Sequence, residues 1–224
     1  MVDADFRPVD SARQARPFDF HPITIQRSKW THQFHVWSPK LSRRISLYSQ
    51  TSVEFWAMME SYASVLMFCE YPGLILVDQK PRVADFVLRR EDVTEFVVVE
   101  TTPLAAIDAA ALDILDPLPV TTVDADQLKQ HRPWIDNWLR MLPYITSNGR
   151  FISKDLLDRV ERGLTSPKPL YSIEYDALPA DPVLTRTAVF DLTRRGRLVS
   201  ADLHASELSR HTRFSRAIAT EGTS

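Results

Sequence analysis

Three carboxylates stand at positions where acidic side chains are uncommon. Asp85 lies inside the apolar stretch VADFVL, Glu100 ends the β-branched run FVVVE, and Glu54 falls near the start of an expected helix. Acidic side chains are seldom placed in such apolar strands unless a partner compensates for their burial. Two carboxylates on neighbouring strands and a third on a flanking helix form an oxygen cage suited to Mg²⁺ or Mn²⁺. A metal held there would activate a water molecule and screen charge on a phosphate under attack.

A second interpretation of these carboxylates stays open. Acidic residues at strand ends are often simply solvated, and Glu54 could serve a helix N-terminus, whose partial positive charge favours an acidic side chain. Other chemistries have less support. The chain has five glycines and no glycine-rich loop that could cradle the phosphates of ATP. Cys69 is the only cysteine and is typical of a small buried hydrophobic residue.

The composition predicts a folded protein without a membrane segment. The chain has 224 residues, of which 44% are hydrophobic and 25% charged, enough for one sizeable core and a small second one. No apolar run approaches the roughly 18 residues that span a bilayer, and the N-terminus lacks a signal-peptide pattern. A single cysteine offers no disulfide, so we expect a cytoplasmic location.

The net charge of −2 hides an uneven distribution of charge. The segment 21–48 has five basic residues and no acidic one, 91–126 has nine acidic residues and no basic one, and 185–216 has seven arginines against three acids. Two basic ends around an acidic middle indicate a protein that holds DNA phosphates at its periphery and cations centrally. Chance clustering of surface charge is the alternative. The expected DNA-binding residues are Lys40, Arg43, Arg44, Arg194, Arg195 and Arg197.

Hydrophobic periodicity predicts an α/β fold with a mixed sheet after a loose arm over 1–27. A short β-rich segment over 33–48 precedes a helix over 51–68, which Thr51 or Ser52 could cap. Strands are then expected over 73–78, 83–89, 94–102 and 119–124, and helices over 104–115 and 126–145, the last one bent near Pro133.

The stretch PYITSNGR, 143–150, indicates a boundary between a first domain over 28–145 and a second over 146–224. The second domain begins with an amphipathic helix over 152–164 and a proline-rich connection over 165–181. A further helix then stops at Gly196 and leads into a strand that carries several arginines. A helix followed by an arginine-bearing hairpin is typical of a winged-helix module.

The ordered stretches WSPKLSRRISLYSQTSVEF, FCEYP, VADF and VVVE resemble the TnsA family, the endonuclease subunit of heteromeric transposases. The later stretch PVTTVDADQLKQHRPWIDNWLRMLPYI resembles the strand and helix that follow the family's active site, and RRGRLVSADL resembles part of its second domain. The resemblance covers roughly residues 28–215. It implies a PD-(D/E)xK-type nuclease domain, with a restriction-endonuclease-like mixed sheet flanked by helices, followed by a small α-rich winged-helix-like domain.

By this resemblance the family's helix glutamate falls on Glu54, its P-D-F aspartate on Asp85 with Ala84 in place of the proline, and its last acidic position on Glu100. These three residues would bind Mg²⁺, with Mn²⁺ able to substitute. The family lysine falls on Thr102, and a threonine hydroxyl cannot supply its positive charge on the transition state. Either Lys80, just upstream of Asp85, supplies the charge, or the subunit is a catalytically inactive architectural one.

The resemblance also implies a function and partners. The family nicks the 5′ ends of a transposon in double-stranded DNA, while a TnsB-like DDE transposase cuts and joins the 3′ ends. A TnsC-like ATPase contacts the C-terminal region, and the complex acts at the bacterial nucleoid. Two alternatives stay open: an inactive nuclease-fold subunit that bridges DNA and transposase, and a free-standing restriction or repair nuclease that needs no transposase.

Overall fold

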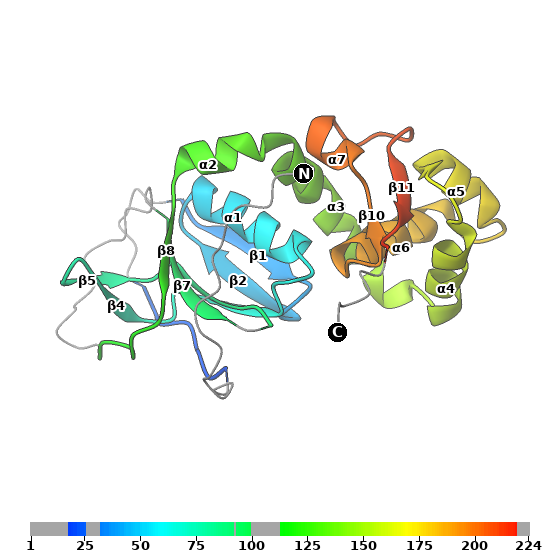
Figure 1. Ribbon diagram of the computed structural model, residues 1–224. Helices are drawn as coiled ribbons and strands as arrows, with labels where there is room; N and C mark the ends of the chain where they lie inside the picture. The colour runs from blue at the N-terminus through cyan, green and yellow to red at the C-terminus, as the bar shows by residue number, and fades with distance from the viewer. Residues whose placement is uncertain (1–17, 26–31, 92, 100–112, 219–224) are drawn as a thin grey trace, which may run out of the picture.

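The computed structural model describes residues 18–25, 32–91, 93–99 and 113–218. In Figure 1 a strand-rich part from the first half of the chain stands beside a helical part from the last third, and α3 runs between them. The elements of the first part are β1 (Phe34–Ser38), β2 (Arg43–Leu47), α1 (Gln50–Ser61), β3 (Met67–Glu70), β4 (Leu74–Val77), β5 (Lys80–Val83), β6 (Phe86–Arg89), β7 (Thr94–Val99), β8 (Val120–Val123) and α2 (Ala125–Gln130).

Four strands form the main sheet in the order β3-β6-β7-β8. The first three are antiparallel to one another, and β8 runs parallel to β7. Side chains of β7 alternate between two hydrophobic clusters: Val97 and Val99 join the main core, while Phe96 and Val98 join a smaller one on the other face. Burial on both faces explains why FVVV is an unbroken apolar run. The predicted α/β class with a mixed sheet is confirmed.

Two hairpins flank the main sheet. The predicted strands around SPKLS are confirmed as β1 and β2, which pair antiparallel. The hairpin of β4 and β5 turns through Asp78 and Gln79, whose φ angles are 50° and 62°. Two positive φ angles are the signature of a type I′ turn, which matches the twist of a tight two-residue hairpin. The turn therefore fixes the register in which Ile75 faces Arg82.

Helix α1 packs between the main sheet and α3, and it is shorter than the sequence predicts. The expectation of a helix over 51–68 is wrong beyond Ser61, because Met67 to Glu70 pair with β6 as strand β3. The ammonium of Lys40 explains this end: its Nζ donates to the carbonyls of Tyr62 and Val65, at 2.6 Å each, just after the last helical turn. The N-cap is Ser49 rather than Thr51 or Ser52.

The long helix α3 (Arg132–Asn148) joins the two parts of the molecule. Asp124 caps α2 in a capping box with Gln127, and the expected bend near Pro133 is the break between α2 and α3. Trp134 of α3 donates from Nε1 to the Ser61 hydroxyl of α1 at 2.8 Å. The amide of Asn137 holds the second part, since it bonds the carbonyls of Leu203 and Ser206 and the Leu208 N–H.

The second part packs helices against a small antiparallel sheet in the order β10-β11-β9. The stretch 143–150, expected as a domain boundary, forms the end of α3 and a 3₁₀ turn, and the main core continues from Ile145 to Leu156. The proline-rich connection contains a helix, α5, that the sequence analysis missed.

No described helix has the length and apolar character needed to cross a membrane. The elements are η2 (Gly149–Phe151), α4 (Lys154–Gly163), β9 (Lys168–Pro169), α5 (Leu170–Asp176), α6 (Pro182–Arg194), β10 (Leu198–Val199), α7 (Asp202–Ala205) and β11 (Arg213–Arg216).

Candidate functional site

Asp85 lies where three strands of the first part meet. It stands between β5 and β6, not within a strand as its alternating neighbours suggest. Its backbone still joins the neighbouring elements: the Asp85 N–H donates to the carbonyl of Val97 at 2.9 Å, and its carbonyl accepts from the Tyr71 N–H at 2.9 Å. The side chain has no exposed surface. A rigid frame of two strands and a turn therefore holds this carboxylate in place.

A backbone N–H and an arginine lie beside the buried Asp85 carboxylate. The backbone N–H of Val99 donates to Oδ2 at 2.7 Å, and Nη2 of Arg82 lies 3.9 Å from the same oxygen. Arg82 also donates from Nη2 to the Val99 carbonyl at 3.0 Å. A buried carboxylate without such donors and charge would cost several kcal/mol, so these contacts offset part of the cost of burying Asp85. They tie Asp85 to the last residue of β7.

Tyr71, in the FCEYP stretch, forms the floor beside Asp85. It is buried, its φ is 45°, and its hydroxyl accepts from the Tyr48 N–H at 3.2 Å. Burial raises the pKa of the Tyr71 phenol, and the charge of Asp85 raises it further. The phenol therefore stays protonated at neutral pH. Ser52 of α1 also bonds this phenol, so one face of α1 reaches the Asp85 region.

Glu54 lies on another side of α1. Its Oε1 accepts from Nη1 of Arg132 on α3 at 2.8 Å and from Nε2 of Gln50 at 3.2 Å. Glu54 is two positions after Ser52, which is about 200° around a helix of 3.6 residues per turn. The hydrogen bond to Asp136 and then the one to Glu54 raise the pKa of Arg132. The described contacts thus place Glu54 at the junction of α1 and α3.

The other expected catalytic residues divide into two groups. Glu100 and Thr102 lie outside the described residues; β7 ends at Val99, the residue before Glu100. Lys80 is described: it is the exposed first residue of β5, next to the turn, and it faces Val77 across the hairpin. Arg82, two residues further along β5, is the cation beside Asp85. The sequence analysis missed Arg82, although a basic residue three positions before Asp85 was visible in KPRVAD.

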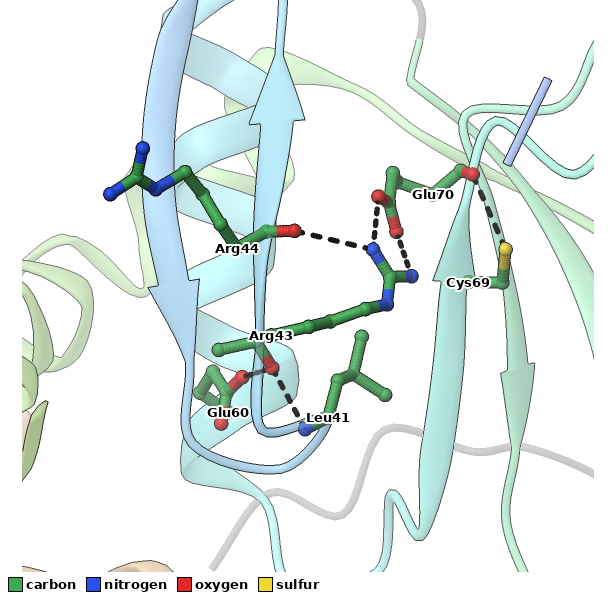
Figure 2. Close-up of polar contacts among 7 residues, drawn as sticks. Leu41, Arg43, Arg44, Glu60, Cys69 and Glu70 are labelled. Carbon is green, nitrogen blue, oxygen red and sulfur yellow. Dashed lines mark hydrogen bonds and ion pairs between the residues drawn. The ribbon is translucent and has the colours of Figure 1, made fainter. Parts of the chain in front are cut away.

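Two of the expected DNA-binding residues in the first part have structural partners, and Figure 2 shows one of them, Arg43. Arg43 forms two hydrogen bonds with Glu70, Nη1 to Oε1 and Nη2 to Oε2, each 2.6 Å long, and this pairing raises the pKa of Arg43. Lys40 binds the carbonyls after α1, and desolvation lowers its pKa to about 8. Arg44 points away from this network and is exposed. It is the expected DNA-binding residue of the first part that is open to a phosphate.

The three expected DNA-binding arginines of the second part contact carboxylates. Arg194 and Arg195 both pair with Asp191 of α6, while Arg197 contacts Glu161 of α4. Arg194 is largely buried, whereas Arg195 and Arg197 remain about half exposed. These carboxylates would compete with DNA phosphates for the arginines, so the positive charge of this cluster is partly neutralised. Asp191 lies three and four positions before Arg194 and Arg195, a helical spacing that is visible in the sequence, whereas the Glu161 partner of Arg197 comes from another helix.

Comparison of the chain with models of known protein families and with curated proteins gives no match. Among the described residues, which exclude Glu100, no group of three or more His, Cys, Asp or Glu side chains is placed to hold a metal. The donor chemistry at Asp85 itself, a carboxylate fixed by a backbone N–H, fits a hard divalent cation.

Proposed function

We propose that this protein is a metal-dependent DNA endonuclease subunit of a heteromeric transposase, TnsA-like, that nicks the 5′ ends of a transposon. The observation that carries the proposal is the hydrogen bond from the Val99 N–H to the buried Asp85 carboxylate. It places the aspartate of the VADF motif at the end of the VVV strand, one residue before Glu100. Two motifs that are separate in the sequence, and that resemble one nuclease signature, therefore converge at one point.

The architecture around this point also supports the proposal. A four-stranded mixed sheet, preceded by α1 and followed by α2 and α3, agrees with the restriction-endonuclease-like core that the resemblance implies. In the second part, α6 is followed by β10 and β11, and Arg197, Arg213 and Arg216 lie on or beside these strands. This arrangement supports the winged-helix-like interpretation and a role of this part in binding DNA or a TnsC-like partner.

Asp85 and Glu100 would hold the metal, with Glu54 as a third ligand if it exchanges Arg132 for the cation. Mg²⁺ or Mn²⁺ bound there supplies Lewis acidity toward a water molecule and a phosphate oxygen. The residues of the chain orient the ligand, exclude water and limit the negative charge at the site. The Val99 N–H orients Asp85, the surrounding apolar strands exclude bulk water, and the protonated Tyr71 phenol adds no further negative charge near the site.

One observation favours a second candidate, an inactive architectural subunit. Glu54 already has a cationic partner in Arg132, and the lysine of the family motif is replaced by Thr102. A nuclease fold that only bridges DNA and a TnsB-like transposase would have no use for a free Glu54. The two candidates differ in one measurable property, which is strand cleavage with Mg²⁺ or Mn²⁺.

The test is nicking of supercoiled DNA that carries the element's ends, with the partner transposase present. We expect the wild type to nick and Asp85→Asn to lose nicking, because asparagine keeps the acceptor for Val99 but removes the metal-binding charge. Glu95→Gln is the matched control, since Glu95 is another buried acid of the same sheet, paired with Arg90 far from Asp85. Equal nicking by folded Asp85→Asn would overturn the site. Nicking without any transposase would indicate a free-standing nuclease instead.

A further inference from the structure

Arg82 is the cation that the fold brings to the candidate active site. The tight turn at Asp78 and Gln79 fixes the β4–β5 register, so the position of Arg82 on β5 follows from local geometry. From there its guanidinium reaches Asp85 at 3.9 Å and the Val99 carbonyl at 3.0 Å. The charge of Arg82 therefore lies beside both the Asp85 carboxylate and the end of β7.

We propose, on the basis of the proposed nuclease function, that Arg82 replaces the missing motif lysine and stabilises the phosphate in the transition state. In the hydrolysis, the water oxygen bonds to phosphorus while the bond from phosphorus to the leaving nucleotide oxygen breaks. The water loses a proton and the leaving oxygen gains one. Negative charge accumulates on the non-bridging oxygens as the new bond forms. A nearby guanidinium therefore binds the transition state more strongly than it binds the ground state.

The geometry of Arg82 leaves it free to act on a phosphate. A guanidinium has five N–H donors arranged in a fork that suits phosphate, and the Val99 carbonyl takes a hydrogen bond from Nη2 alone. The side chain of Arg82 is 33% exposed, whereas the Asp85 side chain has no exposed surface. The Arg82 side chain can therefore be reached from solvent, whereas the Asp85 carboxylate cannot.

Lys80, the residue expected for this role from sequence, is less well placed. It shares a face of β5 with Arg82 under period-two alternation, but it stands two residues, about 7 Å, further from Asp85 along the strand. It begins the strand beside the turn and is exposed. We therefore assign the positive charge that the motif lysine would supply to Arg82 of β5 and not to Lys80.

The experiment compares Arg82→Gln, Arg82→Lys and Lys80→Ala in the nicking reaction, and it measures Mn²⁺ binding separately by electron paramagnetic resonance without DNA. We expect Arg82→Gln to lower the nicking rate by roughly 10²–10³, the usual cost of losing one transition-state donor. Arg82→Lys should recover part of the rate. Mn²⁺ affinity should be unchanged or higher in Arg82→Gln, because a positive charge beside Asp85 has been removed.

Arg90→Gln is the matched control. Arg90 pairs with the buried Glu95 at 3.2 Å and is 37% exposed, but it follows β6 at the end away from Asp85. Equal nicking by Arg82→Gln and wild type overturns the proposal, as does a rate loss in Lys80→Ala alone. Loss of both nicking and Mn²⁺ binding in Arg82→Gln would reduce Arg82 to a positioning residue and also overturn it. A wild type that neither nicks nor binds Mn²⁺ refutes the nuclease function itself.

Discussion

Arg43 of β2 and Glu70 of β3 form a two-pronged ion pair that ties the β1–β2 hairpin to the main sheet, with both N–O distances 2.6 Å. Glu70 is almost fully buried, whereas Arg43 is partly exposed. A cluster of basic residues on the hairpin was expected to bind DNA, yet this pairing gives Arg43 a structural role. Its neighbour Arg44 has no such role and points the other way (Figure 2).

This difference predicts unequal effects of two adjacent substitutions on stability. Arg43→Gln should lower the free energy of unfolding by about 2 kcal/mol, because it leaves the buried Glu70 carboxylate without its charged donor. Arg44→Gln is the matched control and should change it by less than about 0.5 kcal/mol, as is usual for exposed sites. Urea unfolding of both variants measures this. Equal stability of the two variants would contradict the structural role of Arg43.

For affinity toward duplex DNA, we expect Arg44→Gln to have a larger effect than Arg43→Gln. Because Arg44 is exposed, it can neutralise a phosphate without breaking an internal pair, and Arg44→Gln should weaken binding to duplex DNA. The slope of log affinity against log salt should fall by up to about 0.9 for one lost phosphate contact. Arg194→Gln is the comparison, since Arg194 is largely buried against Asp191. An unchanged slope in Arg44→Gln would mean that the hairpin is not part of the DNA interface.

Lys40 predicts a distinctive dependence of stability on pH. Desolvation lowers its pKa in the folded state to about 8 from the usual 10.5, so between these two pH values the unfolded chain binds more protons than the folded one. Stability from this group must therefore rise as pH increases from 8 to 10.5 and stay flat below 8. We expect the stability of wild type relative to Lys40→Met to rise over that window in chemical unfolding.

The nearby Glu60 should act in the opposite sense at acid pH. Its carboxylate is buried with Ser38 and the Lys40 backbone N–H, and desolvation raises its pKa above the usual 4.5. The folded state then binds the extra proton first, so the contribution of Glu60 to stability declines as pH rises through its folded pKa. Glu60→Gln should remove that decline. An identical pH profile for wild type and Glu60→Gln would contradict the assignment.

The sequence predicted those elements whose signals are local. Strand β7 was predicted from its β-branched run, and α3 from the helical spacing of its apolar residues. The predicted helix continued past Ser61 because its apolar spacing persists, whereas pairing with β6, which is a long-range contact, makes 67–70 a strand. Helix α5 was missed because the prolines of this segment favour a connection without a helix. In the structure they lie outside α5, so they do not interrupt it.

The candidate site was predictable in its residue types but not in its contacts. Asp85 stood out as an acid among apolar neighbours, and this depended only on adjacent residues. The hydrogen bond between Val99 and Asp85, and the approach of Arg82, depend on how β5, β6 and β7 meet, and no spacing rule gives that. Likewise, the basic clusters and the short spacing between Asp191 and Arg194 were visible in sequence, while Glu70, which pairs with Arg43, comes from another strand.

Glu54 decides between an enzyme and an architectural subunit. In the structure it accepts from Arg132 at 2.8 Å, so a metal ion must displace a guanidinium to use it as a ligand. If Glu54 is a ligand, Arg132→Gln should tighten Mn²⁺ binding, because the competing cation is gone, and Glu54→Gln should weaken it.

The stability of the same two variants provides the control. Arg132 is 45% exposed, so the coupling between Glu54 and Arg132 in a double-mutant cycle should be no more than about 1 kcal/mol. A weak coupling ensures that any change in Mn²⁺ affinity reports on ligation and not on loss of the fold. Unchanged Mn²⁺ affinity in both variants would assign Glu54 to the contact between α1 and α3. Glu54 would then be no ligand, and only Asp85 and Glu100 would remain as candidate carboxylates for the metal.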